Sequence, residues 1–224
     1  MIEIFKNRDL DALQRKIEGD VALLNSYVRN DDFWDTPLII SCRNGYYEFI
    51  DYLLDKGADV NIGDKLVEES DRRFMWDKST PLHIACRNGD FNISQELIEK
   101  GAVINMKDDC GMIPLYFAIQ SKNIGLIRFL IERGADVNEP INSGQNSVFY
   151  ALEDSDVEIL EMLIKSGADI NKRMDGGWTP LLSAVSAGQY KIAALLLRNG
   201  ADRSARTEAG WDMDRLAGDR EKPG

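Results

Sequence analysis

The chain repeats itself along most of its length with a fixed period. One series consists of small residues that recur first after 44 residues and then four times after 33. In the copies that keep a threonine, the small residue stands five positions after it. A second, independent series of Gly-Ala pairs recurs after 44, 33, 33 and 33 residues. Two anchors that keep one period predict a solenoid of stacked repeats rather than a single closed core. The first series is Ser41, Ala85, Ala118, Ala151, Ala184 and Ala217, and the second begins at Gly57, Gly101, Gly134, Gly167 and Gly200.

The best-preserved copy of the repeat is Thr80-Pro81-Leu82-His83-Ile84-Ala85. Its first three residues return as Thr36-Pro37-Leu38 and Thr179-Pro180-Leu181, and as Ile113-Pro114-Leu115 without the threonine. The period and this motif resemble the ankyrin repeat over roughly residues 1 to 217. The resemblance implies an all-α repeat solenoid of helix-turn-helix units with β-hairpin loops, called fingers below. It also implies an interaction scaffold that binds a protein partner.

The two anchor series divide the chain into consecutive segments. We expect an N-terminal capping repeat, five ankyrin repeats and a C-terminal partial cap, with a long finger inserted after the first repeat. These segments are 1–35 (cap), 36–68 with the inserted finger 69–79, 80–112, 113–145, 146–178, 179–211 and 212–224 (partial cap).

Each repeat carries its own start and stop signals. The threonine hydroxyl can cap a short first helix, and the proline after it stands where its missing N–H costs nothing. A second, apolar helix follows and ends at the recurring glycine. In the N-terminal segment, apolar residues from Leu10 to Ile17 recur at three- and four-residue spacing, which predicts an amphipathic helix. The link 31–35 between this segment and Thr36 is expected to be irregular.

The 44-residue step places 11 extra residues between Gly57 and Thr80, within 64–78. Insertions in repeat proteins fall in loops, often on the binding face. A tolerated surface excursion is the alternative, since lengthening a loop costs little entropy. The run Phe74-Met75-Trp76 favours binding, because three large apolar residues at the end of a loop are unusual unless something covers them.

The composition narrows the choice of partner. The chain has 38 acidic and 27 basic residues and a net charge of -11. It therefore lacks the excess of positive charge expected of a nucleic-acid-binding protein, and the acidity fits either a basic protein partner or a solvated surface. The charged N-terminus and the lack of a long apolar run predict neither a signal peptide nor a membrane span. With three cysteines in no metal-binding spacing, we expect a cytoplasmic monomer.

The residues that could carry chemistry have structural explanations. His83 is the one histidine and belongs to the repeat motif, so we expect its ring to bond backbone within its own repeat junction. The pairs Asp108-Asp109 and Glu68-Glu69 are expected to be exposed turn residues without a pKa shift. We predict no catalytic residue, no metal site and no cofactor.

The ankyrin resemblance implies a concave binding face made of the fingers and the exposed side of each first helix. All four tryptophans fall in finger segments, and tryptophan and arginine are enriched at binding hot spots. For these tryptophans, packing within the array is the alternative to contact with a partner. The predicted partner-binding residues are Trp34, Arg43, Phe74, Met75, Trp76, Lys78, Arg87, Met112, Gln120 and Trp178.

Three functions remain open on this basis. The first is a non-catalytic adaptor or scaffold. The second is an inhibitor, an immunity-type protein or an assembly chaperone that blocks a basic target. The third, an enzyme of unrecognised type, is disfavoured by the missing catalytic groups.

Overall fold

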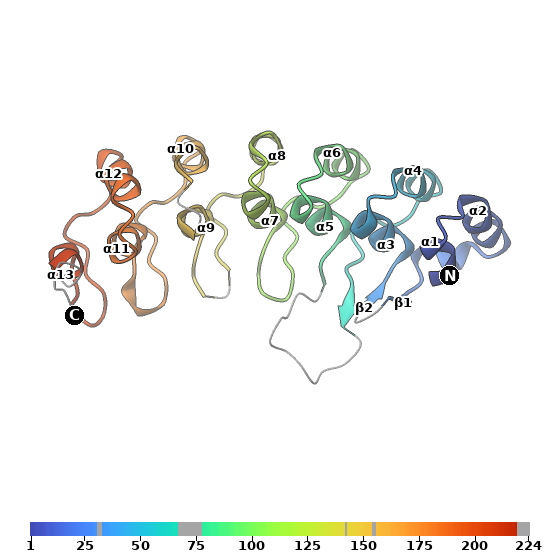
Figure 1. Ribbon diagram of the computed structural model, residues 1–224, viewed down its shortest axis with the longest axis horizontal. Coiled ribbons are helices and arrows are strands. Elements are labelled where there is room, and N and C mark those ends of the chain that lie inside the picture. Colours follow the sequence, from blue (N-terminus) through green and yellow to red (C-terminus); the bar gives the residue numbers. More distant parts are fainter. Residues whose placement is uncertain (31–32, 67–77, 142, 154–155, 219–224) are drawn as a thin grey trace. The chain divides into compact units, whose positions relative to one another are not determined.

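The computed structural model describes residues 1–30, 33–66, 78–141, 143–153 and 156–218. It divides into two compact units, Met1–Leu126 and Ile127–Gly224, and the boundary falls inside one helix. In both units, short helices lie in antiparallel pairs, with the connecting fingers all projecting to the same side of their own unit (Figure 1).

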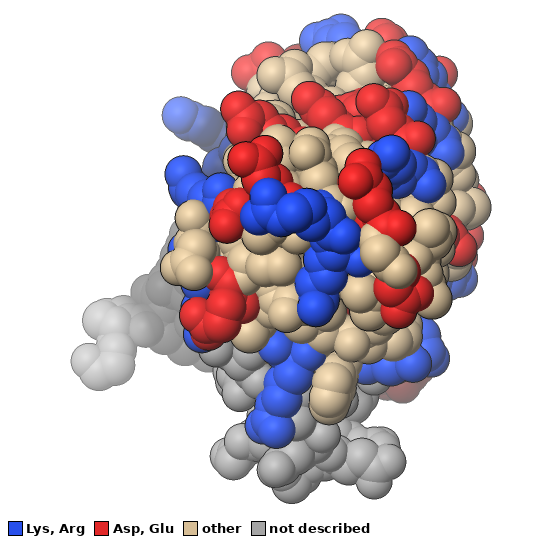
Figure 2. All heavy atoms as spheres, turned by 90° about the vertical axis from the view of Figure 1, so that its right-hand side faces the viewer, with Lys and Arg blue, Asp and Glu red and all other residues tan. Residues whose placement is uncertain are grey.

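The first unit begins with α1 (Ile2–Lys6), α2 (Leu10–Gly19) and a 3-10 turn η1 (Val21–Asn25). The predicted amphipathic helix is confirmed as α2, which Asp9 caps and which buries Leu13 and Ile17. The end of the unit that faces the viewer in Figure 2 carries Lys, Arg, Asp and Glu side chains interspersed with one another. A mixed charged surface of this kind suits the end of a stack that faces water.

Two helical pairs follow in the first unit, α3 (Pro37–Asn44) with α4 (Tyr47–Asp55) and α5 (Pro81–Arg87) with α6 (Phe91–Glu99). The unit then continues through α7 (Pro114–Ser121) into α8 (Ile124–Glu132), where the boundary lies. The second unit contains α9 (Ser147–Glu153) with α10 (Val157–Lys165), the finger turn η3 (Asp175–Gly177), and α11 (Pro180–Ser186) with α12 (Tyr190–Arg198). A last helix, α13 (Met213–Gly218), packs against α11 through Leu216.

The predicted signals are found at the helix ends. The Thr36 hydroxyl accepts a hydrogen bond from the Ile39 N–H at 3.3 Å, and Thr179 does the same for Leu182. Proline stands at the first turn of α3, α5, α7 and α11. The recurring glycines that end the second helices all have positive φ, as a left-handed turn requires; they are Gly57, Gly101, Gly134, Gly167 and Gly200.

The core of each unit is formed by the facing sides of paired helices. In α4, for example, Phe49, Ile50 and Leu53 are 3% exposed or less. Burying one such side chain stabilises the fold by about 1.5–3 kcal/mol. No pair is large enough to bury its own faces, so neighbouring pairs supply most of each other's core contacts.

Asparagines in the outward turns tie neighbouring repeats together. The Asn61 side chain accepts from Val103 N–H at 2.9 Å and donates to Gly101 O at 3.2 Å. Within the second unit, Asn138 and Asn171 make the same two bonds to the repeat that follows them. In the N-terminal segment, Asn25 likewise accepts from Asp59 N–H at 2.9 Å. We call this contact, an asparagine side chain bonded to backbone of the next repeat, the asparagine clamp. It is therefore also present in a segment whose own sequence has lost the motif.

The link before Thr36 differs from the expectation of an irregular segment. Strands β1 (Val28–Asn30) and β2 (Phe33–Asp35) pair antiparallel, and β3 (Lys65–Leu66) pairs with the other side of β2. Val28, Phe33 and Trp34 favour strand geometry, and Asn30 followed by two aspartates is a typical turn composition. These signals were in the sequence but fall outside the repeat period. In the described residues these are the only strands; the later fingers are closed by isolated backbone bonds.

No helix in the described residues is both long and apolar enough to cross a membrane.

Candidate partner-binding site

From the long finger onward, the five fingers in the described part of the chain are closed at the base by the same backbone hydrogen bond. The residue that enters the finger donates its N–H to the carbonyl of the residue that leaves it. In the first finger, these residues, Asp64 and Ser79, are 15 positions apart, while in the other fingers they are four apart. The five bonds, all between 2.9 and 3.1 Å, are Asp64 to Ser79, Asp108 to Met112, Ile141 to Gln145, Met174 to Trp178 and Thr207 to Trp211. The long finger therefore keeps the base geometry of the short ones.

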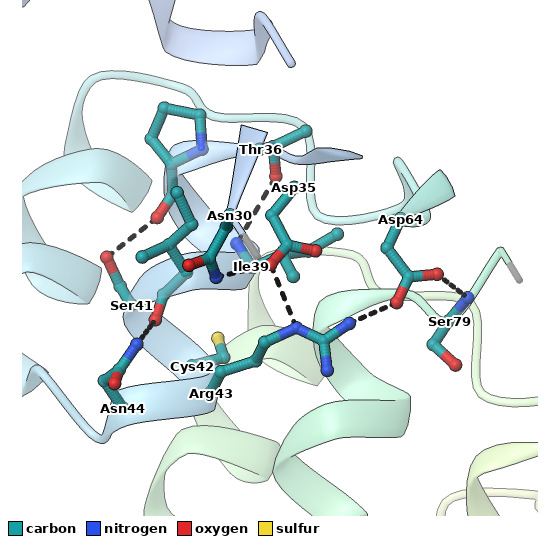
Figure 3. A network of polar contacts seen from close by, with 12 residues as sticks. Asn30, Asp35, Thr36, Ile39, Ser41, Cys42, Arg43, Asn44, Asp64 and Ser79 are labelled. Atoms are coloured by element: carbon teal, nitrogen blue, oxygen red, sulfur yellow. Dashed lines mark hydrogen bonds and ion pairs between the residues drawn. The ribbon is translucent and has the colours of Figure 1, made fainter. Parts of the chain in front are cut away.

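Arg43, near the end of α3, joins that base to the N-terminal strands (Figure 3). Its Nε donates to Asp35 at 3.1 Å, and its guanidinium also pairs with Asp64 and lies 4.4 Å above the Phe33 ring. Asp64 in turn accepts from Ser79 N–H at 2.8 Å. Both carboxylates are fully buried, while the Arg43 side chain is 21% exposed. The charge of Arg43 is therefore largely engaged within the molecule.

Burial raises the pKa of Asp35, and this effect outweighs the opposing influence of Arg43 and of the Asn30 amide. A partner that removed Arg43 from this position would leave two buried carboxylates without their cation, which is strongly unfavourable. We therefore interpret Arg43 first as the residue that fixes the geometry of the finger base.

Arg87 and Asp108 hold the equivalent positions one repeat later, since they lie 44 positions after Arg43 and Asp64. The Arg87 guanidinium lies 4.5 Å above the Phe117 ring. Burial, followed by repulsion from Arg43, lowers the pKa of Arg87 to about 10, and Asp64 and Asp108 oppose this shift. Arg87 therefore stays charged at neutral pH.

Asp108 corrects the prediction of an exposed, unshifted carboxylate. It is 5% exposed and accepts from the N–H groups of Cys110 and Met112 at 2.9 and 2.8 Å. Burial raises its pKa despite these bonds and the nearby Arg87. Its equivalence with Asp64 was visible in the 44-residue spacing and could have identified it as a finger-base residue. Glu68 and Glu69 lie outside the described residues.

His83 has the structural role predicted for it. Its Nδ1 accepts from Thr80 N–H at 3.1 Å, so Nε2 carries the proton and donates to Met112 O at 3.1 Å. The ring therefore connects α5 to the base of the following finger. Burial lowers the His83 pKa to about 4. Among the described residues, the structure shows no group of three or more His, Cys, Asp or Glu side chains that could hold a metal ion.

Lys78 is the residue just before Ser79, which closes the long finger, and its own backbone conformation is unusual. Its φ of +63° lies in the left-handed region, where the equivalent positions of the later fingers have Gly111, Gly144, Gly177 and Gly210. Its exposed ammonium group pairs with Asp109 of the next finger at 2.6 Å. A lysine in this region costs about 1 kcal/mol that a glycine would not. This side chain is therefore held at a strained position on the finger surface.

The remaining predicted contacts are distributed as follows. Trp34 is 38% exposed, but it points away from the Arg43 network, because neighbouring residues of a strand face opposite sides. Met112 is half-buried, and Gln120 is exposed on α7. Trp178 lies in the second unit and is partly exposed. Phe74, Met75 and Trp76 lie outside the described residues.

Three family models match the chain. Ankyrin repeats in three copies match residues 64–141, ankyrin repeats in many copies match residues 120–164 and 148–197, and the single ankyrin repeat matches residues 34–65. A search of the curated proteins found no match. The family matches run from residue 34 to residue 197 and agree with the helical pairs, the proline-started first helices and the closed fingers. The chain belongs to the ankyrin-repeat family.

Proposed function

We propose that the chain is a non-catalytic scaffold or adaptor that binds a protein partner through its fingers and first helices. Ankyrin repeats in general are protein-interaction modules, and they are typically non-catalytic. The observation that carries the proposal for this chain is the closed base of the long finger. Because Asp64 and Ser79 are held together, the inserted segment starts and ends at a fixed point on the repeat.

A fixed base favours binding, because a loop whose ends are already placed loses less conformational entropy when a partner holds it. In the first unit the proposed contact surface includes Lys78, Arg87, Met112 and Gln120, with Phe74, Met75 and Trp76 assigned from the sequence. Arg43 does not belong to this contact surface but holds the base of the long finger through Asp64. Trp178 is proposed as a contact of the second unit.

The deletion of residues 67–77 tests the proposal. It removes 11 residues and leaves Asp64, Lys65, Leu66, Lys78 and Ser79, a finger as long as 108–112. The wild-type chain and the deletion variant are used to capture partners from the native cell, and the recovered proteins are quantified. We expect at least a tenfold loss of the specific partner with a melting temperature within about 2 °C of wild type, because a surface loop adds little to stability.

Replacing Phe74 and Trp76 by alanine gives a milder second variant. Weaker partner recovery at an unchanged melting temperature would support direct contact. A deletion variant that retains full binding would overturn the proposed role of the finger, and an array that melts several degrees lower after the alanine changes would show that the aromatics pack internally.

The net charge of -11 favours one alternative, an inhibitor, immunity-type protein or assembly chaperone that blocks a basic target. The captured partner would then lose its activity when it is co-expressed with the chain, whereas a partner of an adaptor would keep it. We place the protein in the reducing cytoplasm, which fits the burial of Cys42 and Cys86 as free cysteines. We also expect it to be a monomer that binds no nucleic acid.

A further inference from the structure

The three-stranded sheet at the start of the chain has two chemically different faces. Phe33 and Asp35 lie on the face that contacts Arg43. Trp34, between them in β2, faces the other side. Its register partners are Arg29 in β1 and Lys65 in β3, and directly paired residues of antiparallel strands share a face. Arg29, Trp34 and Lys65, together with Tyr27, form what we call the Trp34 face.

The Trp34 face is ordered by contacts of its own. The Tyr27 hydroxyl donates to Gly63 O at 3.0 Å, and the Lys65 ammonium nitrogen lies 3.9 Å from the centre of the Tyr27 ring. Trp34 is 38% exposed, and Arg29 and Lys65 are exposed on either side of it. In the part of the chain that the structure describes, neither cation forms an ion pair. Two cations therefore flank an exposed aromatic ring on a chain whose net charge is -11.

We propose that the Trp34 face is a second interaction surface and that it binds an acidic peptide segment of another protein. Arg29 and Lys65 stand on the two strands beside β2, so their backbones are about 10 Å apart across the sheet. Carboxylates of the peptide would pair with these two cations, while an apolar side chain between them would lie on Trp34. Arginine and tryptophan are the residue types most often found at binding hot spots.

Charge complementarity selects an acidic peptide over other anionic partners. A nucleic acid or an anionic membrane needs many neutralising cations, whereas this face supplies two on an acidic molecule that repels a polyanion. A peptide with a few carboxylates needs only local compensation. This proposal does not depend on the long finger, because none of its residues belongs to 67–77.

The test is a selection from a random library of peptides about twelve residues long, displayed on phage, against the full chain. The double variant R29E/K65E reverses the charge of the face, and W34A removes its ring. The matched control R15E/K16E makes the same charge change on the exposed surface of α2. Folding of every variant is checked by circular dichroism and melting temperature.

We expect acidic peptides with an apolar residue among those enriched by the wild type and by R15E/K16E. Their affinity should fall at least tenfold for R29E/K65E and for W34A, and it should weaken with added salt. Enrichment of the same peptides by R29E/K65E would overturn the proposal. The proposal would also be overturned if the ligands whose binding R29E/K65E and W34A weaken were only neutral or basic peptides. The same holds if they were a single-stranded oligonucleotide or anionic vesicles instead of acidic peptides.

Discussion

At the scale of single residues, the histidine and the two arginines that could suggest chemistry or partner contact make contacts within the fold. His83 bonds the start of its own helix with one nitrogen and the next finger with the other. Arg43 and Arg87 lie on aromatic rings beside buried aspartates. The residue types that suggest chemistry or hot spots in the sequence are therefore partly occupied in holding the repeats together.

His83 should make the protein less stable in mild acid. Its pKa is about 4 in the folded chain and near 6.5 when unfolded, so between these values the unfolded state binds more protons. The stability supplied by the neutral ring is complete above about pH 6.5 and declines as the pH falls, by about 3 kcal/mol once the pH is below the folded pKa. Urea unfolding from about pH 7 to 4.5 should show this decline in the wild type and a flatter profile in His83→Gln.

The buried Asp35 and Asp108 have raised pKa values and act in the opposite direction, since they contribute stability at low pH that is lost as the pH rises. They are present in both proteins, so they cancel in the comparison. Parallel pH profiles for the wild type and His83→Gln would contradict the assignment of the acid sensitivity to His83.

At the scale of elements, the finger base is the feature that the repeat period alone did not reveal. The period placed the helices, their caps and the 11-residue insertion. It did not predict that Asp64 and Asp108 are buried, because neither position belongs to the repeat motif. It did not predict the sheet of β1, β2 and β3 either, because the strand signals fall outside the repeat period and β3 pairs with a strand far from it in sequence. Nor did it predict that Trp34 and Arg43 face opposite sides of β2, since this depends on strand register rather than on the position of a residue in a finger.

Gly63 makes the long finger's base sensitive to a single methyl group. A Cβ at this position would lie 2.6 Å from the carbonyl carbon and oxygen of Lys78, so the two backbones would have to move apart. Gly63→Ala should therefore destabilise the protein by about 1–3 kcal/mol in urea unfolding, as overpacking does. It should also weaken partner capture, because the base would no longer hold the finger as it does now.

Gly19→Ala is the matched control for this change. Gly19 ends α2, and a Cβ there would meet no atom within 4 Å. It should leave stability unchanged or raise it by up to about 1 kcal/mol through better helix propensity. Equal effects of the two alanines would show that the close approach at Gly63 does not govern the finger base.

At the scale of the whole molecule, stability within each unit is built from contacts between neighbouring repeats. The asparagine clamps make this coupling specific, because Asn61 and Asn171 bond backbone of the next repeat through both the oxygen and the nitrogen of the side-chain amide. Stability in such arrays is approximately a sum of repeat and interface terms. Loss of one clamp should therefore loosen the repeat beyond it rather than the whole chain.

Asn171 in the second unit offers the clearest test of this coupling. Its side chain accepts from Asp202 N–H at 2.8 Å and donates to Gly200 O at 3.2 Å, whereas Asn199 donates to Leu195 within its own helix at 2.8 Å. Asn171→Ala should cost about 1–2 kcal/mol, the net value of two hydrogen bonds, and Asn199→Ala about half as much. Hydrogen exchange should become faster across residues 200–218 in Asn171→Ala, because those residues would lose their attachment to the repeat before them. Similar exchange in the two variants would show that the clamp does not couple neighbouring repeats and that packing between helices alone does so.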